Sequence, residues 1–299
     1  MFYFPDMGLF SSKPKPEPKP KPETPLLDEP WREINWSDRQ GALQAVNNFR
    51  PQTEDQQIRI LLHGPVGAGK SSFINSVQSV LLGRMYKLAL VDNVSHGCFT
   101  KKYITYKIQK ERPKTFYPFV FNDIMGLDST EGFQVDDIKL ALMGHVKDGY
   151  KFNPKSKLSK EDRFYNKSPS VNDQVQVLVC VVPADTLEPL KDKTVQKIRD
   201  IRLEASHLGI PQVAILTKVD KACPEVGKDL KNIYRSKRLK EKMEEFSKDT
   251  GIPMNCIFPI KNYHEEIELS DDADVLILST LRHLLSFGED FLKWKAARH

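Results

Sequence analysis

The stretch Gly64-Pro65-Val66-Gly67-Ala68-Gly69-Lys70-Ser71 decides the fold, because it fits the pattern GxxxxGK[ST]. The apolar run 58–62 before it predicts a buried strand, and residues 72–82 after it have the periodicity of a helix. A strand, this loop and a helix, in that order, form a phosphate-binding loop. Its glycines let backbone N–H groups point inward around a phosphate, and the start of the helix adds more such groups. The alternative, a glycine-rich turn that matches by chance, is disfavoured because both flanks fit.

Each position of this loop has an expected role in binding phosphate. We expect Lys70 to reach the β and γ phosphates as a positive charge and Ser71 to give its hydroxyl to Mg²⁺. The other residues expected to contact the nucleotide here are Gly64, Val66, Gly67, Ala68, Gly69 and Ser72. ATPases, GTPases and small-molecule kinases share the motif, so alone it indicates a class of ligand and no reaction.

A second element, Asp123-Ile124-Met125-Gly126, stands at the end of a predicted strand. We expect the carboxylate of Asp123 to hold Mg²⁺ through a water molecule, and the backbone N–H of Gly126 to meet a γ-phosphate. The threonine that completes such a magnesium site is assigned to Thr100, with Ser95 and Thr105 as alternatives. Thr105 is the weaker alternative because it lies inside a strand pattern.

A third element, Thr217-Lys218-Val219-Asp220, follows the predicted strand 213–216 and matches the [NT]KxD signature of guanine-binding proteins. A carboxylate at Asp220 can accept from both N1–H and the N2 amino group of guanine, whereas adenine has neither donor there. The stem of Lys218 is expected along the face of the base. After the next strand, Ile260 and Lys261 are expected at the base, where the backbone N–H of Lys261 would bind the guanine O6. Together the motifs predict GTP or GDP with Mg²⁺.

The rest of the chain alternates strands with helices. Strands are expected at about 57–63, 103–108, 119–123, 175–182, 213–216 and 255–259. Helices are expected at about 70–83, 134–147, 190–207, 228–248 and 272–297. Alternation of this kind predicts an α/β fold in which a mainly parallel sheet carries helices on both faces.

Two segments precede the expected domain. Residues 1–30 form a Pro/Lys-rich tail, for which we expect disordered, extended and solvated chain. We interpret the tail as a spacer, with an SH3-type ligand as the alternative. The lead-in segment 31–56 contains Trp31 and Trp36, whose rings we expect to dock on the core. Ser37 is a candidate cap for a short helix.

The nucleotide-binding domain is expected to span residues 57–299, with an insertion at about 149–173. The insertion has no clear periodicity and is rich in Lys, Ser and Asn, so we expect a flexible surface loop. Its aromatic residues suggest that parts of it pack; these are Tyr150, Phe152, Phe164 and Tyr165.

Composition limits the classes of protein. The chain has 299 residues and a net charge of +5, and no apolar run approaches the length of a membrane span. Its start lacks the basic residues of a secretory signal. The four cysteines contain no CxxC pair, which fits the reducing cytosol and argues against a zinc site. We therefore expect a cytoplasmic protein without a transmembrane segment. The basic helix at 228–248 is interpreted as a solvated face, so nucleic acid is not expected as a partner.

The motifs and two longer segments resemble known proteins. The arrangement is similar to the Ras-like P-loop GTPase superfamily. More closely, residues 59–76, Tyr150-Lys151-Phe152-Asn153-Pro154 and Phe258-Pro259-Ile260-Lys261-Asn262-Tyr263 resemble the interferon-induced protein 44 family. The resemblance implies an interferon-stimulated, cytoplasmic protein with a guanine-nucleotide domain and an antiviral or immune-regulatory role. Larger members carry an N-terminal TLDc domain, and we expect a short form without it, so no function of that domain is carried over.

Two functions fit these residues. The first is a GTP-binding switch that hydrolyses slowly or with a partner, because Leu127 stands where Ras-type enzymes place a water-orienting glutamine. Asp128 is close to that position, but no internal arginine finger can be named. The second is a scaffold in which the nucleotide is structural. Both readings expect protein partners or self-association, and Asp220 disfavours an ATP-dependent enzyme.

Overall fold

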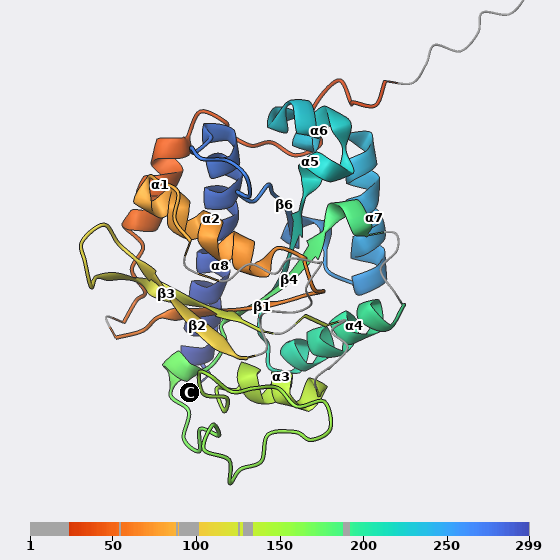
Figure 1. The fold of residues 1–299 in the computed structure, drawn as a ribbon. Helices are drawn as coiled ribbons and strands as arrows, with labels where there is room; N and C mark the ends of the chain where they lie inside the picture. The colour runs from red at the N-terminus through yellow and green to blue at the C-terminus, as the bar shows by residue number, and fades with distance from the viewer. Residues whose placement is uncertain are drawn as a thin grey trace, which may run out of the picture.

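The computed structural model describes residues 24–53, 55–87, 89, 102–124, 126–127, 134–187 and 192–298. Within these residues a six-stranded sheet has the order β2-β3-β1-β4-β5-β6 (Figure 1). The strands are β1 Ile58–His63, β2 Ile104–Gln109, β3 Phe116–Asp123, β4 Val177–Pro183, β5 Gln212–Thr217 and β6 Ile257–Pro259. Only the pairing of β2 with β3 is antiparallel among the described pairs, so the expected mainly parallel sheet is confirmed.

The centre of the sheet is buried on both faces. Every residue of β1 and of β4 is buried, as continuous apolar runs predict for strands between two layers of helices. β1 lies between β3 and β4, so the chain leaves β1 in one direction and later returns on its other side. At such a reversal the loops after neighbouring strands diverge and leave room for a ligand at the carboxyl ends of the strands.

Helices cover both faces of the sheet. The main helices are α1 Arg39–Asn47, α2 Lys70–Leu82, α3 Val135–Leu142, α4 Asp192–His207, α7 Lys237–Thr250 and α8 Asp271–Ala296. α8 contacts α1, α2 and β1, whereas α4 contacts β5, α3 and α7, and the two groups lie on opposite sides of the sheet (Figure 1). α8 approaches closely because Gly288 has no side chain; a Cβ there would lie 2.6 Å from Ile58 Cγ2.

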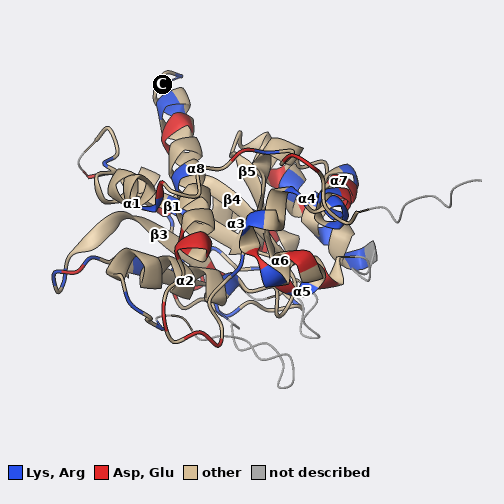
Figure 2. Cartoon of the chain, turned by 90° about the horizontal axis from the view of Figure 1, so that it is seen from above, with Lys and Arg blue, Asp and Glu red and all other residues tan. Residues whose placement is uncertain are grey.

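The helix expected at 228–248 is wrong in its first part. The chain instead forms the short helices α5 Val219–Ala222 and α6 Pro224–Lys228, then a 3₁₀ turn over Leu230–Tyr234, before α7 begins. The Ser236 side chain accepts a hydrogen bond from the backbone N–H of Leu239, at 3.1 Å, and so caps α7. Basic and acidic residues are mixed along α7 (Figure 2), as expected for the solvated face of a helix.

The helix expected at 134–147 is shorter in the structure. α3 ends at Leu142, and Gly144 follows in the left-handed region with φ +84°. The backbone N–H of His145 then bonds the carbonyl of Leu140 at 2.8 Å, which closes the helix end.

The lead-in segment differs from expectation in one detail. Trp31 and Trp36 pack against the core, as predicted. Ser37 does not cap α1, because its hydroxyl donates to the side chain of Asn35 at 2.8 Å and the helix begins after Asp38.

Residues 24–30 were expected to belong to the disordered tail, and this is wrong for the part that the structure describes. The N–H of Leu27 donates to the carbonyl of Arg235 at 2.7 Å, and the N–H of Trp31 to that of Tyr234 at 3.0 Å. Arg32 donates to the carbonyls of Ile257, at 2.7 Å, and Met254, at 2.5 Å. We call residues 24–32 the strap, because these hydrogen bonds hold them against the 3₁₀ turn η4 (Leu230–Tyr234) and against β6. The rest of the expected tail, residues 1–23, lies outside the described residues.

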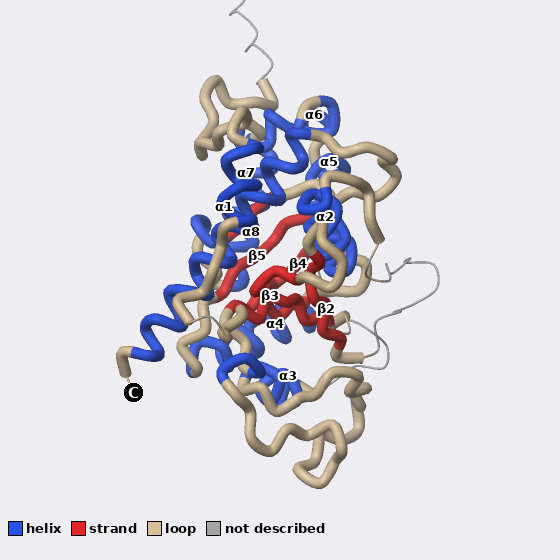
Figure 3. The backbone as a smooth tube through the Cα atoms, turned by 90° about the vertical axis from the view of Figure 1, so that its left-hand side faces the viewer, coloured by secondary structure: helices blue, strands red, loops and turns tan. Residues whose placement is uncertain are grey.

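The insertion at 149–173 packs beside α3 (Figure 3). Tyr150, Phe152 and Tyr165 are buried, as expected, and Phe164 packs against the core. The buried carboxylate of Asp137, on α3, accepts hydrogen bonds from the Tyr150 hydroxyl and the Leu158 N–H, both at 2.8 Å. Burial raises the pKa of Asp137 above its ordinary value. One acidic side chain of α3 thus holds the insertion at two points, Tyr150 and Leu158.

Among the helices that the structure describes, none has both the length and the apolar character needed to cross a membrane.

Candidate functional site

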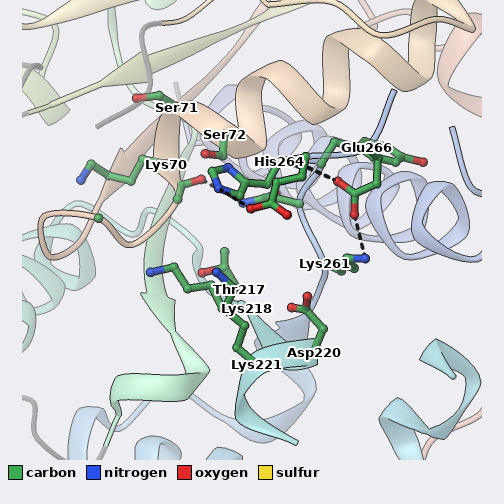
Figure 4. Close-up of a pocket in the computed structure, with 15 residues that line it drawn as sticks. Lys70, Ser71, Ser72, Thr217, Lys218, Asp220, Lys221, Lys261, His264 and Glu266 are labelled. Atoms are coloured by element: carbon green, nitrogen blue, oxygen red, sulfur yellow. Dashed lines mark hydrogen bonds and ion pairs between the residues drawn. The ribbon is translucent and has the colours of Figure 1, made fainter. Parts of the chain in front are cut away.

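A pocket of about 350 Å³ lies where the loops after β1, β5 and β6 meet the start of α2 (Figure 4). Nine of the residues predicted from sequence line it: Gly67, Gly69, Lys70, Ser71, Ser72, Thr217, Lys218, Asp220 and Lys261. The phosphate-loop motif and the guanine-type motif are far apart in the sequence, so the fold brings them to one pocket. This convergence is what a nucleotide site requires of the two motifs.

The phosphate loop is shaped by close backbone contacts. Gly64 has φ +146°, and a Cβ there would lie 1.9 Å from the carbonyl oxygen of Val181, so no side chain fits. A Cβ at Gly126 would lie 2.7 Å from the backbone nitrogen of Val66. The N–H of Leu127 donates to the carbonyl of Gly64 at 3.0 Å. The segment around Gly126 therefore packs directly on the loop, behind the lining of the pocket.

Lys70 is nearly buried at the start of α2. Its Nζ donates to the carbonyl oxygens of Gly64 and Pro65, at 3.3 and 3.2 Å. The ammonium group is therefore held against the loop by neutral acceptors rather than by a carboxylate. The N–H groups in the first turn of α2 have no acceptor in a preceding turn, so positive charge and N–H donors gather at this end of the pocket.

Two of the three residues predicted to hold Mg²⁺, Ser71 and Asp123, are in contact. The Ser71 hydroxyl donates to Oδ2 of Asp123 at 2.6 Å, and both side chains are buried. A hydroxyl and a carboxylate are the oxygen ligands that Mg²⁺ prefers, so the pair fits the ion. Thr100, the third predicted ligand, lies outside the described residues.

A buried histidine that we did not predict stands next to this group. His63, at the end of β1, is 2% exposed, and none of the described residues bonds its Nδ1. Burial, together with the charge of Lys70, lowers the pKa of His63 to about 3. The imidazole is therefore neutral at pH 7 and adds no second positive charge beside Lys70.

The guanine-type motif supports the phosphate loop as well as lining the pocket. The Thr217 hydroxyl donates to the carbonyl of Ala68 at 2.6 Å, and the Asn262 side chain donates to that of Gly69 at 3.1 Å. Lys218 has φ +55°, a strained conformation for a residue with a side chain. The turn after β5 is thus held in one shape, and α5 starts from it at Val219 with Asp220 in its first turn.

Five of the residues predicted to contact the nucleotide are not among those that line the pocket: Gly64, Val66, Ala68, Gly126 and Ile260. Ile260 is fully buried, and its N–H donates to the carbonyl of Leu216 at 2.8 Å, so it fixes the turn after β6 instead. Ala68 is also fully buried; its N–H donates to the carbonyl of Pro65 at 3.3 Å, and its carbonyl accepts from Thr217.

The loop after β6 supplies lining residues that sequence reasoning missed: Asn262, Tyr263, His264, Glu265 and Glu266, with Lys221 from α5. Nζ of Lys261 lies 2.8 Å from the carboxylate of Glu266. Burial opposes ionisation of Glu266, but hydrogen bonds from the His264 backbone and from Lys261 outweigh it and lower its pKa to about 2. The family-like segment 258–263 reaches into this loop, but no motif marks residues 264–266, and only their position after the third base-side element could have suggested them.

Comparison with known proteins agrees with the resemblance seen in the motifs. No family model matches the chain. It is 38% identical over 257 residues, 85% of its length, to interferon-induced protein 44 from Homo sapiens. It is 35% identical over 272 residues, 89% of its length, to interferon-induced protein 44-like from Homo sapiens. The chain is a homologue of the interferon-induced protein 44 family. It spans 58% and 60% of the lengths of these two relatives.

Solved structures are similar to this chain at a much lower level of sequence identity. Toc33 from Arabidopsis thaliana, in complex with Mg²⁺ and GMPPNP, aligns with a TM-score of 0.48 and 14% identity. The alignment covers 85% of this chain and 93% of Toc33. The strand order and the phosphate loop of this chain are themselves those of a GTPase-like fold.

Proposed function

We propose that this chain binds guanine nucleotide with Mg²⁺ in the pocket and hydrolyses GTP slowly or with the help of a partner. The observation that carries the proposal is that Lys70 and Asp220 line one pocket. Lys70 suits phosphate, and Asp220 suits the two donors on the Watson–Crick edge of guanine. On the family relationship alone, we extend the proposal to a cytoplasmic role in the innate immune response.

The chain's own residues divide the binding between them. Lys70 and the N–H groups at the start of α2 would hold the phosphates, and Ser71 and Asp123 would hold Mg²⁺. A bound Mg²⁺ supplies charge neutralisation at the phosphates. Asp220 would select the base, and Thr217 keeps the base-side turn against the phosphate loop through its bond to Ala68, at 2.6 Å.

Slow hydrolysis is expected because Leu127, the residue that follows Gly126, has no side-chain group that could orient a water molecule. Leu127 is fully buried, and its carbonyl accepts a hydrogen bond from Lys197 at 2.6 Å. No arginine is among the described residues that line the pocket. These two observations also favour the second candidate, a scaffold that holds its nucleotide without turning it over.

The nucleotide can be identified directly. Protein purified without added nucleotide is denatured, and the released compound is separated by chromatography; we expect GDP or GTP. Competition against labelled GTP is the second measurement. If ATP displaces labelled GTP as well as GTP does, the guanine assignment is wrong.

The rate of GTP hydrolysis in a single turnover, together with the dependence of partner binding on nucleotide, separates the two candidates. We expect a single-turnover rate no higher than that of Ras alone, about 3–5 × 10⁻⁴ s⁻¹. A rate above about 10⁻² s⁻¹ at low protein concentration, near that of proteins with an arginine in cis, would show that the site holds a catalytic group we have missed. A rate that rises with protein concentration would point to a group supplied by a second copy. A partner that binds equally well with and without nucleotide would favour the scaffold.

A further inference from the structure

The loop over 263–270, between β6 and α8, is closed by one side chain. The hydroxyl of Tyr263 donates to the buried carboxylate of Asp274 at 2.6 Å and accepts from the N–H of Ser270 at 2.8 Å. Arg39 of α1 holds Asp274 in turn, with Nη2 2.6 Å from its carboxylate. The two ends of the loop are therefore fixed to each other and to the first turn of α8.

The pocket side of this loop is fixed as well. The N–H of Tyr263 donates to the hydroxyl of Ser76, on α2, at 3.0 Å. The carboxylate of Glu266 accepts from the N–H groups of His264 and Glu265, at 2.8 and 3.1 Å. The backbone of His264 is thus held between α2 and Glu266, so the position of its side chain is limited to the mouth of the pocket.

The imidazole of His264 lines the pocket without a strong partner. Within the part of the chain that the structure describes, its one polar contact is with Glu265, at 3.8 Å. The side chain of Glu265 is 89% exposed, and an exposed pair at this distance does little to hold a side chain. The ring lies beside Ser72, and Lys218 and Asp220 lie on the other side of the pocket (Figure 4).

From this placement we propose that His264 forms the second wall of the base site and stacks on the purine ring. The inference rests on the proposed function. Asp220 reads the edge of the base, the stem of Lys218 covers one face, and the His264 ring covers the other. Stacking needs only a flat π-face, so this contact adds affinity without selecting among bases. An exposed histidine with no role in binding is the alternative that the experiment has to exclude.

The test compares the Kd of GTP for the wild type with those of His264→Ala and His264→Phe. Base–aromatic stacking predicts that His264→Ala weakens GTP binding about five- to thirtyfold. His264→Phe keeps an aromatic face and should bind GTP within about threefold of the wild type. Tripolyphosphate, which lacks a base, should bind wild type and His264→Ala equally. Glu268→Ala is the matched control, because Glu268 is in the same loop, is exposed and does not line the pocket.

The outcomes separate this inference from the proposed function. If the wild type binds no GTP, the proposed function is wrong and this inference falls with it. If the wild type binds GTP and His264→Ala binds it equally well, only the inference is wrong. If His264→Phe is as weak as His264→Ala, stacking is wrong and the imidazole acts through its nitrogen atoms. A weaker binding of tripolyphosphate to His264→Ala would show a general distortion of the pocket and would also overturn stacking.

Discussion

The two ends of the pocket are built differently. At the phosphate end, the polar groups contact one another: Lys70 bonds the loop carbonyls, and Ser71 bonds Asp123. At the base end, no described residue bonds the carboxylate of Asp220, and His264 has only its 3.8 Å contact with Glu265. The base end is held by its backbone and by Thr217 instead.

This difference indicates how a nucleotide would be received. At the phosphate end a ligand has to replace contacts that the protein already makes within itself. At the base end, the two side chains proposed to meet the base, Asp220 and His264, make no close polar contact with other described residues, so a base displaces little there. Substitutions at the two ends should therefore differ in kind: at one end they affect all nucleotides, and at the other they affect the choice of base.

The largest effect is expected at the phosphate end. Lys70→Ala removes the ammonium group that bonds the carbonyls of the phosphate loop, so it should abolish binding of GTP and of every other nucleoside triphosphate. Ligand at 100 times its Kd stabilises a protein by about 2.7 kcal/mol, which is on the order of 5–10 °C in Tm for a domain of this size. Thermal unfolding with and without Mg²⁺ and GTP should show this shift in the wild type and lose it in Lys70→Ala.

Lys261→Ala is the matched control for that experiment. Its Nζ is 2.8 Å from Glu266, and only its backbone N–H is expected to serve the base, so most of the shift should remain. A full shift in Lys70→Ala would contradict our account of the phosphate end.

A smaller and more selective effect is expected at the base end. Asp220→Asn replaces a carboxylate that accepts at two points with an amide that suits xanthine better. We expect GTP to bind roughly 10- to 100-fold more weakly, the loss of a hydrogen bond to a charged group, and XTP to bind more tightly than before. Competition of labelled GTP by XTP and ATP measures the change. Equal weakening for all three nucleotides would mean that Asp220 only supports the fold.

The two ends should also respond differently to acid. The pKa of His63 is lowered to about 3 in the folded protein. Between pH 6.5 and pH 3 the imidazole is therefore protonated in the unfolded chain but neutral in the folded protein. Stability is therefore fully present above pH 6.5 and is lost as the pH falls toward 3. From pH 7 to pH 5 the loss from this group is about 2 kcal/mol. At the base end, the pKa of Glu266 is lowered to about 2, so its contribution is lost only below about pH 4.5.

Urea unfolding at pH 7 and pH 5 tests this difference. His63→Gln should reduce the change in the free energy of unfolding between the two pH values, whatever it does to stability at pH 7. An unchanged pH dependence in His63→Gln would show that other groups cause the acid sensitivity.

The smallest effect is expected from the tail. Deleting residues 1–23 should change Tm by less than about 2 °C, a change in stability below roughly 0.5 kcal/mol. Arg32→Ala is the contrasting variant, since it leaves the carbonyls of Met254 and Ile257 without their donor and should cost about 1–3 kcal/mol. A larger loss from the deletion than from Arg32→Ala would mean that residues before the strap also pack.

The sequence predicted best what is determined locally. The phosphate loop and the turn at Thr217 have shapes that a few neighbouring residues dictate, and both line the pocket as expected. The strap and the His264 loop were not predicted, because they depend on contacts such as Arg32 with Ile257, which join residues far apart in the sequence. The break before α7 could have been found from the capping residue Ser236.

The strap affects whether copies of this protein aggregate at high concentration. β6 is the outer strand of the sheet, and an outer strand offers unpaired backbone groups to any other extended chain. Arg32 takes the carbonyl of Ile257 out of that role, and its guanidinium lies over the rings of Trp31, Tyr234 and Phe258, which hold it in place. A chain trimmed to begin after Arg32 should still contain every nucleotide motif, yet it would present an uncovered strand edge and aggregate edge to edge.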